Sequence, residues 1–113
     1  MIWVKVLSKQ EQIGDDFVKM VMANGKKICL VKTGAQFYAI QNTCPHAGGI
    51  LSGGWCTEGH IVCPIHRWSY SLTTGRGAEG QGDYIRIYPT QQRDDGLYVG
   101  LKENWLKKFI SIG

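Results

Sequence analysis

Two short motifs constrain this chain more than any other feature: residues 44–46 (C-P-H) and residues 63–66 (C-P-I-H). Each motif supplies one cysteine and one histidine, and only residues 47–62 separate them. Thiolate and imidazole are donors that proteins use to bind iron and zinc. We therefore expect the two motifs on two facing loops that hold one metal centre. The candidate ligands are Cys44, His46, Cys63 and His66.

The distribution of the donors between the motifs favours iron over zinc. Zinc fingers usually group cysteines with cysteines and histidines with histidines, whereas each motif here carries one of each. This pattern resembles the Rieske signature, in which two cysteines bind one iron of a [2Fe-2S] cluster and two histidines bind the other. The resemblance implies that the four candidate ligands hold such a cluster. Residues 42–51 and 62–75 read like the first and second cluster-binding loops of that family.

The residues beside the candidate ligands fit two tight loops. Pro45 and Pro64 each follow a ligand cysteine and have no backbone N–H, so they stiffen the loops and leave neighbouring amides free for the sulfurs. Gly48 is one of several glycines that let the backbone turn where a side chain would crowd a cluster.

The same resemblance predicts a low reduction potential within the family. In high-potential members of the cytochrome bc type, two extra cysteines form a disulfide and a serine donates a hydrogen bond to a bridging sulfide. The corresponding positions here are Gly49, Ile65 and Trp68, so the disulfide is absent and one stabiliser of the reduced state, the serine hydroxyl, is lost. Tyr70 matches a tyrosine that bonds a ligand cysteine sulfur in the family, although a tyrosine there also suits core packing.

The remaining cysteines and histidine have simpler interpretations. Cys29 lies in an apolar run, residues 27–32, and is predicted to be a buried thiol. Cys56 lies between the motifs, but its spacing matches no ligand position, so we expect a core or loop thiol. His60 is expected to be solvated and without a functional role.

Length and composition predict a single domain over residues 1–113. Short β-prone runs separated by turn residues predict an all-β fold. Asn24-Gly25 indicates a type I′ hairpin, and residues 94–96 indicate another turn. The family resemblance implies an antiparallel β-sandwich, with a small cluster-binding part at about residues 42–72 on a base formed by the rest. The predicted strands are residues 2–7, 17–22, 27–32, 36–40, 68–72, 84–88 and 96–101.

The C-terminal tail has a different pattern. Trp105, Leu106, Phe109 and Ile110 recur at helical spacing, which predicts a short terminal helix. Its apolar stripe is expected to pack on the sandwich, the alternative being a partner or membrane surface.

Charge and segment composition narrow the class of function. The formal net charge is +4, but the basic residues are dispersed and no nucleic-acid recognition motif accompanies them, so we expect no nucleic-acid partner. No run approaches the roughly 20 apolar residues of a membrane span, and the cysteines need no disulfides, so a cytoplasmic protein is expected.

By elimination, the chain is expected to carry electrons rather than to be an enzyme. It has no glycine-rich dinucleotide fingerprint and no length for a second domain with a mononuclear iron site. It is similar to the ferredoxin that passes one electron from a flavin-dependent reductase to a Rieske-type, ring-hydroxylating oxygenase. One alternative is the small subunit of an assimilatory nitrite reductase. An alternative from another class is an interaction module stabilised by zinc.

Overall fold

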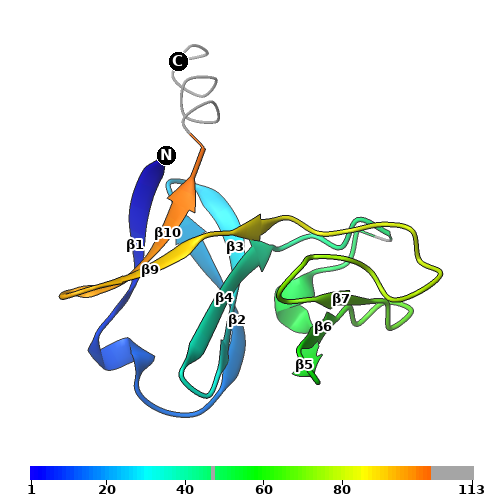
Figure 1. The fold of residues 1–113 in the computed structure, drawn as a ribbon, viewed down its shortest axis with the longest axis horizontal. Coiled ribbons are helices and arrows are strands. Elements are labelled where there is room, and N and C mark those ends of the chain that lie inside the picture. Colours follow the sequence, from blue (N-terminus) through cyan, green and yellow to red (C-terminus); the bar gives the residue numbers. More distant parts are fainter. Residues whose placement is uncertain (47, 103–113) are drawn as a thin grey trace.

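Two antiparallel sheets form the base of the molecule (Figure 1). The computed structural model describes residues 1–46 and 48–102, so the predicted C-terminal helix lies outside the described residues. One sheet has the order β1-β10-β9 and the other has the order β2-β3-β4-β8. The strands are β1 (Ile2–Ser8), β2 (Phe17–Ala23), β3 (Lys26–Thr33), β4 (Gln36–Gln41), β8 (Ile87–Tyr88), β9 (Thr90–Arg93) and β10 (Gly96–Leu101).

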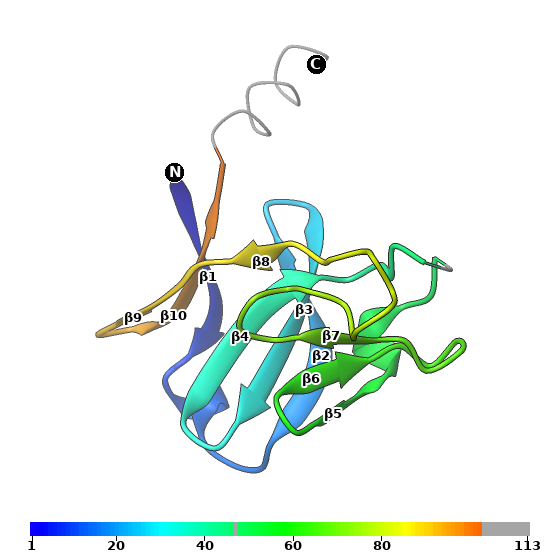
Figure 2. The ribbon, with the colours of Figure 1, turned by 45° about the vertical axis from the view of Figure 1, so that its right-hand side comes forward.

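A third, smaller sheet lies to one side of the base, on the right in Figure 1 and towards the viewer in Figure 2. Its strands are β5 (Trp55–Thr57), β6 (His60–Val62) and β7 (Ser69–Ser71), and all pair antiparallel. Two single-turn 3-10 helices, η1 (Gln10–Gln12) and η2 (Leu51–Gly53), complete the elements. The prediction of an all-β, antiparallel fold is confirmed. Among the described residues, no helix has the length and apolar character needed to span a membrane.

Most strands lie where the sequence predicts them. Asn24 and Gly25 have φ values of 51° and 82°, and Ala23 pairs with Lys26 across them, as the predicted type I′ turn requires. The predicted strand at residues 84–88 shortens to Ile87–Tyr88, and the one at 68–72 to Ser69–Ser71. Three short strands fall outside the predicted ranges: β5 and β6 have only three residues each, and β9 reads T-Q-Q-R without apolar alternation.

Strand β3 is buried on both faces, and it therefore belongs to two hydrophobic cores. Ile28 and Leu30 face the core of the base, between its two sheets. Cys29 and Val31 point to the opposite face, because successive side chains alternate across a strand. The second core continues into the part of the molecule that carries the third sheet, which we call the small part. There it includes Leu51, Ile61, Tyr70, Leu72 and Ile85. The small part is thus anchored by packing to the central strand of the base.

Leu30→Ala tests the contribution of β3 to the base. Leu30 is fully buried, so we expect the substitution to lower the free energy of unfolding by about 3 kcal/mol through lost burial and an unfilled cavity. Chemical denaturation measures this change. Lys27→Ala on the same strand is the control, because its exposed side chain predicts a change within about 0.5 kcal/mol. Equal effects from both substitutions would contradict this view of the core.

Candidate metal centre

The first motif lies on a tight loop between β4 and η2. The backbone N–H of Cys44 donates to the carbonyl of Gly49 (2.8 Å), and the N–H of Gly48 donates back to the carbonyl of Cys44 (2.9 Å). Gly48 adopts φ +70°, a region that glycine enters without steric cost. Below this turn, the Leu51 N–H donates to the carbonyl of the buried Asn42 (2.7 Å). These bonds close the loop and fix the direction of the Cys44 side chain.

The second motif lies on the turn between β6 and β7. The N–H of Cys63 donates to the carbonyl of Trp68 (2.7 Å) and closes the turn. His66 and Arg67 have φ values of 62° and 57°, an unusual conformation for two consecutive residues other than glycine. Each such residue costs roughly 1–2 kcal/mol. Backbone strain of this kind concentrates at functional sites, where the surrounding structure maintains it.

The two loops bring the four candidate ligands together as two pairs. Cys44 and Cys63 are buried, with 1% and 0% of their surface exposed, and their thiols are close enough to hydrogen-bond. His46 and His66 are exposed, and their ring centroids lie 5.8 Å apart. Thus the sulfur donors form a buried, inner pair and the nitrogen donors form an exposed, outer pair.

The inner pair can ionise to two thiolates only beside a bound cation. Burial raises the pKa of the Cys63 thiol, the backbone N–H of Ile65 opposes this shift, and the neighbouring Cys44 adds to it. Two adjacent thiolates without a positive charge would repel each other in this buried position. A metal that binds both sulfurs supplies that charge and deprotonates them.

Gly49 leaves the space that the inner pair needs. A Cβ at this position would lie 2.8 Å from the Sγ of Cys63 and 3.1 Å from the side chain of Ile65, closer than packed atoms approach. The two positions that carry the additional disulfide in high-potential family members therefore lie beside each other here, as glycine and isoleucine.

The donor set fits a two-iron cluster. Each pair supplies the two ligands that one iron of a Rieske cluster takes. Within residues 1–46 and 48–102, no group of three or more His, Cys, Asp or Glu side chains is placed to hold a metal ion, so the fit rests on the two separate pairs. Pro45 and Pro64 are exposed beside the cysteines, where they limit the freedom of both loops.

Trp68 packs directly against one of the candidate ligands. Its indole stacks on the His46 ring with centroids 3.6 Å apart and an angle of 11° between the planes. The sequence placed Trp68 near the centre but did not indicate this contact, because the two residues come from different loops. The stack restricts the rotation of His46, an exposed side chain that would otherwise sample several rotamers.

Tyr70 lies beneath the inner pair and has two neighbours that can accept its proton. Its hydroxyl donates to the Asp83 carboxylate (2.8 Å), and the same oxygen lies 3.5 Å from the Sγ of Cys44. Burial raises the pKa of the Tyr70 hydroxyl well above its usual value, and its contacts with Cys44 and Asp83 raise it further. Asp83 lies outside both motifs, so the sequence pattern did not single it out.

The other two thiols lie where they were expected, whereas His60, which was expected to be solvated, is half-buried. Cys29 is fully buried in β3, and burial raises the pKa of its thiol to about 12. Cys56 is half-buried in β5 and packs against the core that holds the small part, with a pKa raised mainly by burial. His60 begins β6, and its Nδ1 lies 3.0 Å from the carbonyl oxygen of Glu58. The contact of His60 is therefore with Glu58 and not with a candidate ligand.

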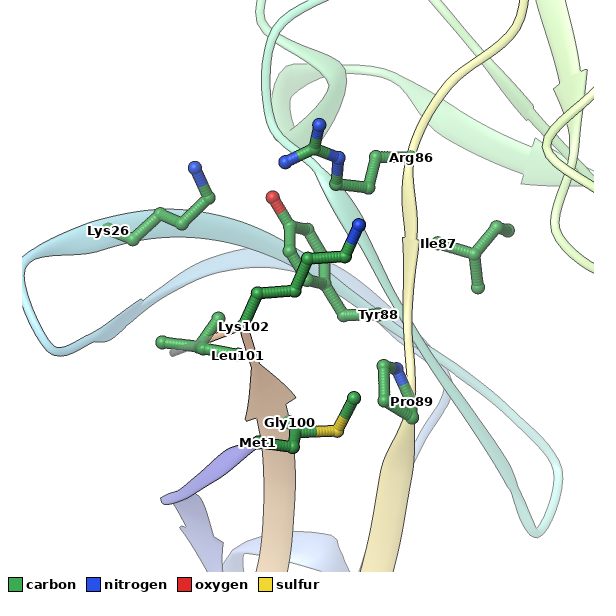
Figure 3. Close-up of a pocket in the computed structure, with 9 residues that line it drawn as sticks. All are labelled: Met1, Lys26, Arg86, Ile87, Tyr88, Pro89, Gly100, Leu101 and Lys102. Carbon is green, nitrogen blue, oxygen red and sulfur yellow. The ribbon is translucent and has the colours of Figure 1, made fainter. Parts of the chain in front are cut away.

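A small pocket on the base gathers basic side chains (Figure 3). Lys26, Arg86 and Lys102 come from three different segments and lie around Tyr88, and Pro89 also lines the pocket. The cavity has a volume of about 150 Å³, and the candidate ligands do not line it. Three of the chain's basic side chains therefore meet at this place on the base.

Comparisons with known proteins agree with this centre. Residues 2–89 match the family described as "Rieske [2Fe-2S] domain". The chain is 30% identical over 100 residues to the ferredoxin component of the naphthalene 1,2-dioxygenase system of Pseudomonas aeruginosa, covering 88% of this chain and 95% of that protein.

Solved structures show the same fold. The ferredoxin of carbazole 1,9a-dioxygenase from Nocardioides aromaticivorans IC177 is 26% identical and has a TM-score of 0.78, covering 90% of this chain and all of that one. A chain in the complex of reduced oxygenase and oxidized ferredoxin in carbazole 1,9a-dioxygenase is 25% identical with a TM-score of 0.76, covering 89% and 98% of the two chains. The match over residues 2–89 and these relatives show that the chain belongs to the Rieske [2Fe-2S] domain family.

Proposed function

We propose that this chain is a one-electron carrier, the ferredoxin component of a ring-hydroxylating oxygenase system. The observation that carries the proposal is the pairing of two buried thiols and of two exposed imidazoles on the same two loops. The relatives described above are themselves ferredoxin components of dioxygenase systems. A [2Fe-2S] cluster bound here supplies reversible uptake and release of one electron. The protein is thus an electron-transfer component and not a catalyst.

We assign the cluster ligands residue by residue. Cys44 and Cys63 would hold one iron, and His46 and His66 would hold the other. The buried sulfurs are kept from water, whereas the exposed imidazoles reach the surface where a partner docks. Trp68 keeps the His46 ring in one orientation, so the exit point for the electron has a defined position.

We assign two partners, one that receives the electron and one that donates it. A terminal oxygenase receives the electron, as the oxygenase and ferredoxin of carbazole 1,9a-dioxygenase form a complex. For the electron donor we propose a flavin-dependent reductase, because the chain itself has no dinucleotide-binding fingerprint. We place the system in the cytoplasm, where cysteines stay reduced.

Metal and sulfide analysis tests the ligand assignment. Anaerobically purified protein should contain two irons and two acid-labile sulfides per chain, and its reduced form should show the EPR signal of a mixed cysteine–histidine cluster. Cys44→Ser or His66→Ala should abolish that signal, because each removes one ligand. His60→Ala is the matched histidine control and should leave the signal unchanged. One zinc per chain with no labile sulfide would instead support the zinc-stabilised interaction module.

Gly49→Ala tests the space beside the inner pair. The added methyl would lie 2.8 Å from the Sγ of Cys63, so we expect cluster content to fall by at least about half, since overpacking displaces the ligand. Gly53→Ala is the control, because a Cβ there meets nothing within 4 Å. Iron content per folded chain measures the effect. Full iron content in Gly49→Ala would show that the two loops stand farther apart than this structure indicates.

The surface around the exposed histidines is nearly neutral and partly apolar. Between residues 44 and 72 the formally charged residues are Glu58 and Arg67. Ile65, inside the second motif, is 42% exposed. Docking at this surface should therefore depend on apolar contact. Electron-transfer complexes of this kind are typically small and short-lived.

Stopped-flow reduction of the cluster-loaded protein by its reductase tests this docking surface. We expect Ile65→Asp to slow reduction more than Lys26→Ala, because it puts a charge into the apolar contact. Ile13→Asp makes the same change at an isoleucine that is 81% exposed on the base, and it should have little effect. Raising ionic strength should change the rate by less than about tenfold. A dominant effect of Lys26→Ala would show that the basic pocket governs docking.

A further inference from the structure

The proton of Tyr70 can serve only one of its two neighbours at a time. A phenol carries a single O–H, and the hydroxyl oxygen lies 2.8 Å from the Asp83 carboxylate and 3.5 Å from the Sγ of Cys44. The shorter distance is the usual one for O–H···O, and an ionised carboxylate is a strong acceptor. A thiolate that shares its charge with iron is a weaker acceptor than a free carboxylate. The hydroxyl proton therefore belongs to Asp83.

The segment after β7 holds Asp83 in place. The backbone N–H of Gly77 donates to the carbonyl of Asp83 (2.9 Å). The Gln81 side chain accepts from the N–H of Ser69 and donates to its carbonyl (both 3.1 Å), while its amide also lies 3.4 Å from the second Asp83 oxygen. A Cβ at Gly77 would lie 2.8 Å from that oxygen, so only glycine permits this packing. The carboxylate is thus fixed beside Tyr70 by contacts on both sides.

We propose that Asp83 lowers the reduction potential of the centre by withdrawing the Tyr70 proton from Cys44. This inference rests on the proposed function, because it requires Cys44 to be a cluster ligand. A hydrogen bond to a ligand sulfur stabilises the reduced cluster, which is more negative, and so raises its potential. Here the carboxylate removes that bond and adds a negative charge nearby. Both effects favour the oxidised form, and Asp83 is a positioning residue that acts through Tyr70.

A double-mutant cycle tests the inference by potentiometric titration. The cluster-loaded proteins are the wild type, Asp83→Ala, Tyr70→Phe and the double variant. Asp83→Ala should shift the one-electron equilibrium about tenfold toward the reduced form, equal to about 59 mV, because Tyr70 can then donate to Cys44. Tyr70→Phe alone should shift the equilibrium less than about threefold, since the native hydroxyl proton is held by Asp83. In the Asp83→Ala background, Tyr70→Phe should reverse most of the gain.

Two outcomes would overturn the inference. If Tyr70→Phe lowers the potential equally in both backgrounds, the hydroxyl already donates to Cys44 in the native protein. If Asp83→Ala raises the potential by the same amount with phenylalanine at position 70, Asp83 acts by charge alone. Asp94→Ala removes an exposed carboxylate from the turn between β9 and β10 and should leave the potential unchanged.

Two further measurements keep the result decisive. Asp83→Asn retains the side-chain volume with a weaker, neutral acceptor, so it should shift the potential in the same direction by a smaller amount, even if Asp83→Ala folds poorly. Iron, sulfide and EPR of the wild type are measured first. A wild type without a [2Fe-2S] signal would refute the proposed function, whereas a normal signal with no coupling between Asp83 and Tyr70 would refute this inference alone.

Discussion

The alternation of side chains along β3 connects the metal centre to the base. Ile28 and Leu30 pack between the two large sheets, while Cys29 and Val31 pack toward the small part. The core on that second face is continuous with Cys44, Cys63 and Tyr70. A small sheet of three-residue strands would bury little apolar surface alone. The central strand of the base supplies the surface against which the two loops fold.

The four proposed ligands differ in burial, because the two cysteines are buried and the two histidines are exposed. The cysteines are part of the core, so the sulfur side of the centre is shielded from water and enclosed by Gly49 and Tyr70. The histidines are exposed at the surface, and the backbone at His66 is left-handed. The strain at this turn is compatible with a stable fold because the bond from Cys63 to the Trp68 carbonyl closes it.

The sequence predicted the features that depend on local chemistry. The C-P-H and C-P-I-H motifs indicated which donors would meet, and Asn24-Gly25 indicated its turn, since only a few residues tolerate two positive φ values in succession. Features that depend on tertiary contact were not predictable in the same way. Strand β9 has no apolar pattern, because its partner β10 supplies the buried residues. Asp83 contacts Tyr70 because of the conformation of the loop between them, which no sequence motif predicts.

Position 68 shows why residues beyond the ligands distinguish members of one family. Its carbonyl accepts the N–H of Cys63, so the backbone there is fixed by the second loop itself. A serine on that backbone offers a hydroxyl to the cluster, whereas the indole of Trp68 lies flat on His46 and offers none. One side chain cannot both donate a hydroxyl hydrogen bond to the cluster and stack on His46. This chain therefore has a stacked His46 ring in place of that hydrogen-bond donor. Together with the effect proposed for Asp83, this choice leaves the reduced state with few stabilising donors, and we infer that the protein works at the low-potential end of its family.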